Sequence, residues 1–214
     1  MHPSQLQIND FTYDLPDDRI ARYPLTERDL SKLLIYKEGT IATDVYRNLP
    51  QHLPDNAFLV FNNTKVIEAR ILFQKSTGGT IEIFCLEPAA GVELTQAMMS
   101  RGSVRWTCLV GGAGKWKQPF LEKHLSTPQG DVLLRAEKRK QEQGTFEIEF
   151  SWDNTLFTFA ELLHHAGVLP LPPYLQRQSE AADYDRYQTV YARQEGSVAA
   201  PTAGLHFTPQ LLQQ

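Results

Sequence analysis

The feature that most limits the fold of this chain is a change of texture at Ala69. From there to residue 155, short runs rich in β-branched and aromatic residues alternate with glycine-containing turns. Such runs predict several short antiparallel strands that form a small barrel or sandwich. The predicted strands are Ala69–Gln74, Thr80–Leu86, Val104–Val110, Val132–Ala136 and Thr145–Phe150.

The segments that flank this block, 1–68 and 156–214, combine strand and helix signals. We expect short buried strands at Ser31–Tyr36 and Ala57–Phe61, because both are apolar runs bounded by turn residues. The predicted fold class is therefore α+β or mixed. A discontinuous α/β outer domain is interrupted by a small antiparallel β-barrel insert domain at 69–155.

Helix signals lie mainly in the second flanking segment. Thr158, with Glu161 three residues later, forms a capping-box pattern at the start of a helix over Phe159–Ala166. Asp183–Arg193 repeats the helical spacing, whereas prolines keep Leu169–Tyr174 extended. The outer domain is therefore expected to contain two helices joined by an extended segment.

Composition places the chain among globular proteins. Its 214 residues are 42% hydrophobic and 21% charged, which supplies enough apolar material for a core. No apolar run approaches the roughly 20 residues that a membrane helix needs. Cys85 and Cys108 lie inside apolar runs, as reduced core thiols do. We therefore expect a cytoplasmic protein that has no disulfide framework and no membrane partner.

One stretch is strongly basic although the net charge is −4. Residues 101–123 contain five cationic side chains against the single carboxylate of Glu122, with Trp106 and Trp116 interleaved. This pattern is found on phosphate-facing surfaces, and more often on a solvated strand face with tryptophans packed beneath it. The candidate RNA-binding residues are Arg101, Arg105, Lys115, Lys117 and Lys123.

A second unusual segment lies near the end of the chain. Residues 196–208 (GSVAAPTAGLHFT) are mostly small, and small side chains let a ligand approach the backbone closely. His206 is the only side chain there that titrates near neutral pH, so it is the candidate for proton transfer. Tight packing between elements explains the same composition. The sequence offers no metal-ligand spacing, since His164 and His165 are adjacent.

Three ordered stretches match one family pattern. Asp10–Pro24 (DFTYDLPDDRIARYP) is followed by Arg28 and Asp29, Val60–Arg70 reads VFNNTKVIEAR, and Leu169–Phe207 runs from LPLPPY to GSVAAPTAGLHF. In these stretches the chain resembles the S-adenosylmethionine:tRNA ribosyltransferase-isomerases of queuosine synthesis. The last stretch is the closest match and the most specific.

This resemblance implies that S-adenosylmethionine donates its ribosyl group to 7-aminomethyl-7-deazaguanine at the tRNA wobble position. The products are epoxyqueuosine-tRNA, adenine and methionine. S-Adenosylmethionine is then a substrate, tRNA is a partner, and no prosthetic group or metal is implied. For the full-length family a monomer is slightly favoured.

The resemblance also implies roles for individual residues. His206 is the implied catalytic group, Gly204 lines the nucleoside pocket, and Arg177 contacts substrate or RNA. Tyr187 and Tyr191 either stack on a base or pack in the core. The full set of implied substrate-binding residues is Asn62, Asn63, Thr64, Lys65, Arg177, Tyr187, Gln188, Thr189, Tyr191, Pro201, Thr202, Ala203, Gly204, Leu205 and Phe207.

The chain departs from the family pattern in three ways. Lys65 stands where an arginine is usual, and lysine lacks the planar fork of arginine. Glu68 stands where a proline is usual. After Phe207 only Thr208–Gln214 follow, so we expect the outer domain to be incomplete at its C-terminal side. The alternative function is a catalytically inactive RNA- or nucleoside-binding relative or fragment of that family.

Overall fold

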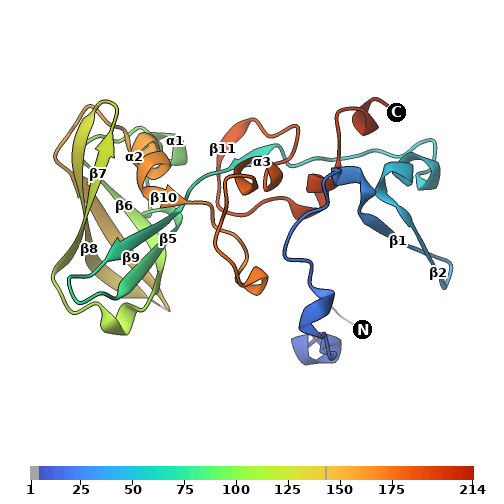
Figure 1. The fold of residues 1–214 in the computed structure, drawn as a ribbon, viewed down its shortest axis with the longest axis horizontal. Coiled ribbons are helices and arrows are strands. Elements are labelled where there is room, and N and C mark those ends of the chain that lie inside the picture. Colours follow the sequence, from blue (N-terminus) through green and yellow to red (C-terminus); the bar gives the residue numbers. More distant parts are fainter. Residues whose placement is uncertain (1–4, 143) are drawn as a thin grey trace.

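The computed structural model describes residues 5–142 and 144–214. The molecule is elongated, with a curled sheet at one end and a β-hairpin at the other (Figure 1). The hairpin pairs β1 (Lys32–Lys37) with β2 (Thr40–Val45). Between the two ends lie β3 (Thr64–Val66), α3 (Asp183–Arg186) and β11 (Gln194–Ser197).

The larger body is an antiparallel sheet curled into a half-barrel. Within the described residues it has seven strands in the order β10-β4-β5-β6-β9-β8-β7. The curl brings the last strand back toward the second, so that Lys123 Nζ donates to the carbonyl of Leu72 at 2.9 Å. The strands are β4 (Arg70–Gln74), β5 (Thr80–Pro88), β6 (Ser103–Gly111), β7 (Phe120–Thr127), β8 (Gly130–Glu142), β9 (Thr145–Trp152) and β10 (Gly167–Val168).

The five strands predicted in this block are confirmed, as β4, β5, β6, β8 and β9. The prediction missed β7, whose only buried side chains are Leu121 and Leu125. In β9, by contrast, every second side chain from Phe146 to Trp152 is buried. Because strands present alternate residues to opposite faces, only a full alternation gives a clear signal.

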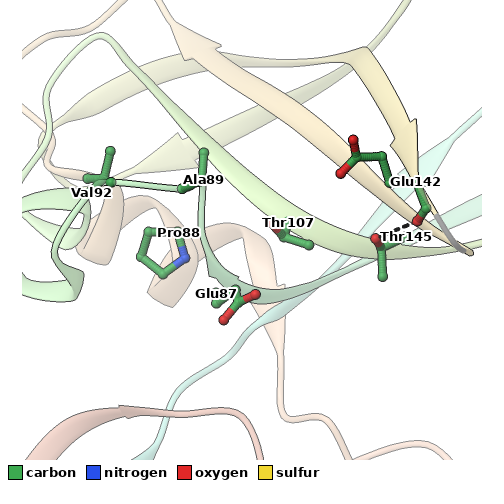
Figure 2. Close-up of a pocket in the computed structure, with 9 residues that line it drawn as sticks. Glu87, Pro88, Ala89, Val92, Thr107, Glu142 and Thr145 are labelled. Carbon is green, nitrogen blue, oxygen red and sulfur yellow. Dashed lines mark hydrogen bonds between the residues drawn. The ribbon is translucent and has the colours of Figure 1, made fainter.

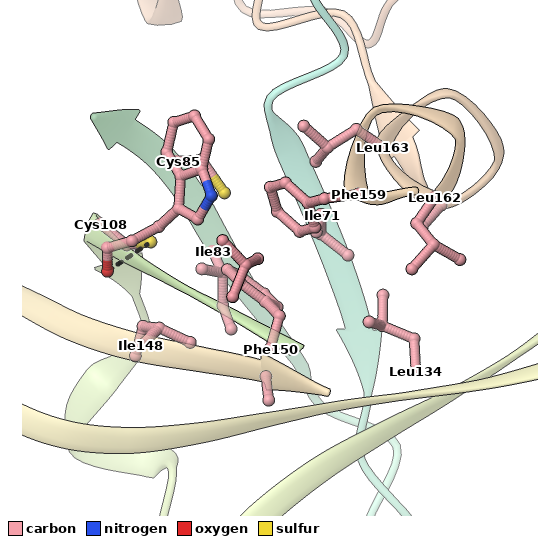
Figure 3. Close-up of a cluster of buried hydrophobic side chains, with 14 of the residues drawn as sticks. Ile71, Ile83, Cys85, Cys108, Leu134, Ile148, Phe150, Phe159, Leu162 and Leu163 are labelled. Atoms are coloured by element: carbon pink, nitrogen blue, oxygen red, sulfur yellow. Dashed lines mark hydrogen bonds between the residues drawn. The ribbon is translucent and has the colours of Figure 1, made fainter. Parts of the chain in front are cut away.

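The half-barrel contains the main hydrophobic core (Figure 3). Cys85 on β5 lies opposite Cys108 on β6, and both thiols are free and buried as predicted. Two short helices pack against this core: α1 (Leu94–Met98) and α2 (Phe159–Ala166). Phe159 is fully buried, with its ring 5.5 Å from that of Trp106.

Local sequence determines both ends of α2. The Thr158 N–H donates to Glu161 Oε2 at 2.7 Å, and the Thr158 hydroxyl accepts from the Glu161 N–H at 3.4 Å. This is the predicted capping box. Gly167 ends the helix as predicted, where a Cβ would lie only 1.9 Å from the carbonyl oxygen of Glu68. Only glycine lets the helix end approach that backbone so closely.

The first outer strand forms as predicted, but its predicted burial is wrong. Leu34 and Tyr36 on β1 are 71% and 73% exposed, and β2 is the only strand that pairs with β1 among the described residues. Glu38 and Gly39 form the turn between them, with φ values of +50° and +80°. These positive φ values are those of a hairpin turn that matches the strand twist.

Two other predictions for the outer segments are wrong. Ala57–Phe61 is not a strand, since it has no pairing strand within the described residues, and Phe58 is 90% exposed. The predicted helix over Asp183–Arg193 ends after one turn. Beyond that turn the side-chain amide of Gln188 bonds to both backbone groups of Val66 on β3, at 2.9 and 2.7 Å. The backbone groups that follow the turn also bond elsewhere, since the Gln188 carbonyl accepts from Arg28 and the Arg193 N–H donates to the Asn63 carbonyl.

The remaining helical pieces are short. Leu169–Pro172 is extended as predicted, but the chain then makes a 3-10 turn. No helix in the described ranges has the length and apolarity to cross a bilayer. Over residues 5–142 and 144–214, the 3-10 helices are Ile8–Phe11, Asp17–Arg19, Arg28–Leu30, Tyr46–His52, Ala113–Lys115, Pro173–Leu175, Thr202–His206 and Leu211–Gln213.

Candidate functional site

One cavity, which we call the histidine cavity, is lined by segments that are far apart in the sequence. It has a volume of about 540 Å³, and its walls come from residues 21–32, 171–187 and 202–206. The predicted site residues that line it are Arg177, Tyr187, Thr202, Leu205 and His206. Its remaining cationic lining residues, all from outside that predicted set, are Arg22, Arg28, Lys32 and Arg186.

His206 lies in this cavity at the end of the 3-10 turn Thr202–His206. Its half-buried ring packs on Tyr46, with the ring centroids 5.1 Å apart. Burial lowers the pKa of His206 below its usual 6.5, and the positive charges of Arg186 and Arg28 add to this effect. A hydrogen bond to the Arg28 backbone opposes the shift. The lowered pKa favours the neutral imidazole, the form that is able to accept a proton.

Arg28 connects the N-terminal wall of the cavity to its C-terminal wall. Its Nη1 donates to the carbonyls of Gln188 and Leu205, at 2.7 and 3.3 Å. Its Nη2 donates to the carbonyl and the carboxylate of Asp185, at 2.7 and 3.2 Å. The side chain is only 10% exposed. This arginine therefore makes its contacts within the protein, where they hold residues from both walls together.

Arg186 makes the reciprocal connection from the other wall. Its two amino groups donate to the carbonyls of Leu25 and Thr26, at 2.6 and 3.1 Å. Burial and the neighbouring Arg28 cation lower the pKa of Arg186. The two cations thus lie close together, and Arg186 donates to carbonyls rather than to a carboxylate. Such a surplus of positive charge favours an anionic group in the cavity.

Arg177 is bound mainly to the protein itself. It pairs with Asp183 through both amino groups, at 2.6 and 2.7 Å, and its Nε donates to the carbonyl of Arg22 at 2.7 Å. With the bond from Nη1 to Gln178, four of its five N–H donors are occupied. Its guanidinium also lies 4.4 Å from the centre of the Tyr23 ring.

The asparagine turn (Asn62–Thr64) and the small-residue segment (residues 196–208) lie side by side. Asn62 Oδ1 accepts from the Thr64 N–H at 2.9 Å, which closes a side-chain turn. The carbonyl of Asn63 accepts from the N–H groups of Arg193 and Gln194. Immediately after these residues β3 and β11 pair in parallel. The two segments that we expected to form one site are thus neighbours.

Aromatic rings occupy much of the space where these segments meet. Phe61 lies 5.1 Å from Tyr191 and 5.2 Å from Phe207, measured between ring centroids. Gly204 is buried beneath them, and a Cβ there would lie 2.1 Å from the Tyr191 hydroxyl. The glycine therefore makes room for a tyrosine of the same chain, as the packing interpretation expected.

Two predicted residues line a different cavity. Lys65 and Gln188 face a hollow of about 430 Å³ between β3 and α2. There His164 Nδ1 lies 3.3 Å from the Glu68 carboxylate. Thr189 is buried outside both cavities. The predicted substrate residues are thus divided between two hollows and the packed region that separates them.

The basic stretch does not form one continuous patch. Arg105 pairs with Glu149 at 2.8 Å, and Lys123 is half-buried. Arg101 donates to the carbonyls of Thr155 and Leu156. Lys115 and Lys117 are exposed beyond the far end of β6, about 26 Å from its start. The two interleaved tryptophans, Trp106 and Trp116, are 1% and 2% exposed, so they pack beneath the surface.

A third hollow lies on the half-barrel surface (Figure 2). It is lined by Glu87 and Glu142 among small residues, and the Thr145 hydroxyl donates to the carbonyl of Glu142. None of the predicted site residues lines it. Across the described ranges, no cluster of three or more His, Cys, Asp or Glu side chains is arranged to hold a metal ion.

Sequence reasoning missed the arginine pair of the histidine cavity as a functional unit. Arg28 was part of the family-like opening stretch, but Arg186 carried no signal of its own. The two residues are 158 positions apart in the sequence. Only the folded chain brings them together around His206.

Comparison with known proteins identifies the family that this chain matches. The family described as "Queuosine biosynthesis protein" matches residues 8–214. The S-adenosylmethionine:tRNA ribosyltransferase-isomerase of Pelobacter propionicus is 41% identical over 209 residues, which cover 97% of this chain and 56% of that protein. The protein of the same name from Trichlorobacter lovleyi is 36% identical over 209 residues, covering 97% and 55%.

A third relative, from Nitratidesulfovibrio vulgaris, carries the same name and is 41% identical over 211 residues. That match covers 95% of this chain and 56% of the relative. The chain spans about half the length of the curated relatives it matches. Since the family match extends over nearly all of its residues, the chain belongs to the queuosine biosynthesis protein family.

Proposed function

We propose that this chain carries the His206 site of an S-adenosylmethionine:tRNA ribosyltransferase-isomerase. The donor is S-adenosylmethionine, the acceptor is 7-aminomethyl-7-deazaguanine at the tRNA wobble position, and the products are epoxyqueuosine-tRNA, adenine and methionine. The observation that carries the proposal is a half-buried imidazole in a cavity built from two of the family-like segments. The reaction belongs to the cytoplasm, where tRNA is found.

In this proposal His206 is the proton acceptor. The positive sulfonium acidifies the adjacent ribose carbon, and a neutral imidazole takes the proton from it. The amine nitrogen of the acceptor base bonds to the ribosyl group and loses a proton. The glycosidic C–N bond breaks and adenine leaves with a proton, and the carbon–sulfur bond breaks so that methionine leaves as the epoxide ring closes. The cations of Arg28 and Arg186 favour an anionic part of the substrates, either the methionine carboxylate or an RNA phosphate. No metal or prosthetic group takes part in the proposed scheme.

The decisive experiment measures adenine release from labelled S-adenosylmethionine. The chain is incubated with tRNA that contains 7-aminomethyl-7-deazaguanine, and with unmodified tRNA as the control. Release that depends on the modified tRNA supports the proposal, and His206→Gln should abolish it. Binding of that tRNA without adenine release would support the alternative, a noncatalytic RNA-binding module. Normal turnover by a folded His206→Gln variant would remove the proton-transfer role.

We also propose that the exposed lysines beyond β6 contact tRNA. Lys115 and Lys117 are exposed members of the basic stretch that lie between β6 and β7 rather than within a strand. The double variant Lys115→Gln/Lys117→Gln should weaken tRNA binding. It should also make the slope of log K against log[salt] shallower by the equivalent of about two phosphate contacts. Lys37→Gln on the distant hairpin is the control. Equal tRNA affinity of the double variant and wild type would contradict this assignment.

The domain division remains part of the proposal. An outer domain of residues 1–68 and 156–214 with a β-barrel insert at 69–155 is supported by two separate hydrophobic clusters. The smaller cluster contains Val66, Leu169 and Leu171, all from the proposed outer domain. Because α2 packs in the larger cluster, a second boundary near Val168 fits the core better.

A further inference from the structure

The two walls of the histidine cavity exchange arginines. Arg28 reaches from the N-terminal wall to three carbonyls of the C-terminal wall, and Arg186 reaches back to two carbonyls of the N-terminal wall. The partners of Arg28 lie 157 to 177 positions away along the chain. These hydrogen bonds hold together segments that are far apart in the sequence.

Arg28 touches the His206 turn in two ways. Its Nη1 donates to the carbonyl of Leu205, the residue directly before His206. Its own backbone forms a hydrogen bond with the His206 ring. The Arg28 side chain thus holds the peptide that carries the imidazole. Tyr46 packs on the ring, and its hydroxyl donates to the carbonyl of Ala203 at 3.3 Å.

We propose that Arg28 is a positioning residue for His206. Its guanidinium acts through the Leu205 carbonyl to hold the turn that carries the imidazole in the histidine cavity. The inference rests on the proposed function, in which His206 accepts the proton. Arg28 itself does not touch the reacting atoms.

The geometry requires an arginine at this position. The two amino groups reach acceptors on Gln188, Leu205 and Asp185, which lie on separate parts of the loop. A planar guanidinium with spaced donors spans such a set, whereas the single ammonium of lysine does not. Lysine keeps the positive charge, however. Arg28→Lys therefore separates the effect of the fork from the effect of the charge.

The test follows the His206 ring by NMR titration in Arg28→Lys, Arg28→Gln and a control, Arg22→Gln. Arg22 lines the same cavity, and its side chain makes no hydrogen bond or ion pair with other described residues. The groups that face the imidazole are Arg28, Arg186 and Tyr46. Unchanged half-barrel resonances show in each case that the chain is folded.

We expect the pKa of His206 to rise toward 6.5 in both Arg28 variants, because the freed turn exposes the ring and burial is the main cause of its depression. The control should titrate as wild type does. In the adenine-release assay, kcat of Arg28→Lys should fall about 10-fold or more, with KM changed less than about twofold. The acidic limb of its pH–rate profile should move with the NMR value.

An unchanged His206 pKa in folded Arg28→Lys would overturn the inference. So would a pKa that moves while kcat stays at the wild-type value, since His206 would then not be the proton acceptor. If wild type releases no adenine, the proposed function fails. In that case the titration still decides whether Arg28 positions the imidazole.

Discussion

Gly204 offers the sharpest test of how the small-residue segment is built. A Cβ at this position would lie 2.1 Å from the Tyr191 hydroxyl and 3.1 Å from Thr189 Cγ2. Overpacking of this kind costs about 2 kcal/mol. Since 1.4 kcal/mol corresponds to a factor of ten, Gly204→Ala should increase local opening about 30-fold.

The assay must report on this region rather than on the half-barrel. All three tryptophans, Trp106, Trp116 and Trp152, lie in the half-barrel, so their fluorescence does not follow the His206 turn. Amide hydrogen exchange at Phe207, whose N–H donates to the carbonyl of Gly204, does follow it. Exchange at Phe207 should accelerate about 30-fold in Gly204→Ala.

A second substitution makes the reasoning refutable. Tyr191→Phe removes the clashing hydroxyl, after which the nearest ring atom lies 3.2 Å from the added Cβ. The double variant should recover about 1.5 kcal/mol relative to the sum of the two single variants. Gly114→Ala, where a Cβ meets nothing within 4 Å, is the matched control. Wild-type exchange in Gly204→Ala, or no rescue by Tyr191→Phe, would show that the glycine does not serve packing.

Three further outcomes are expected. Gly167→Ala should destabilise the half-barrel by about 3 kcal/mol, because its Cβ would meet the Glu68 carbonyl at 1.9 Å; a urea titration followed by tryptophan fluorescence measures this. Arg177 lowers the pKa of Asp183, so their pair stabilises the fold above the unfolded value of 3.8 and is lost as pH falls through the folded value. Asp183→Asn should remove that acid-induced loss, as measured by exchange at the Tyr187 amide. The Asp44 carboxyl should titrate at about 2 by NMR, since His52 is its main hydrogen-bond partner.

Strong local signals in the sequence predicted much of the half-barrel and the helix beside it. The alternation from Phe146 to Trp152 needs only the pleat of a strand, and the Thr158–Glu161 capping box needs only one helical turn. The prediction failed where a strand depends on a distant partner. Ala57–Phe61 has the composition of a buried strand, yet burial depends on a neighbouring element that a local pattern does not specify.

The candidate site was predictable only in part. The sequence identified His206 by its chemistry, and the family resemblance grouped Asn62, Asn63 and Thr64 with the residues around His206 as one substrate-binding set. It did not reveal that Gln188 bonds to Val66, or that Arg177 is occupied by Asp183. Such roles depend on hydrogen-bond partners that only tertiary structure assigns. Residue type alone therefore overestimated how many of the predicted residues are free to bind a substrate.

The arginine exchange has a consequence for how the chain matures on the ribosome. Arg28 leaves the exit tunnel long before Leu205, the acceptor 177 positions behind it. The half-barrel, whose contacts all lie between these two points, is free to form first and thereby brings its own ends together. Arg28 then waits without its partners until Asp185, Gln188 and Leu205 have left the tunnel. Nascent chains halted before residue 205 should accordingly show a protease-sensitive N-terminal segment beside a protected sheet.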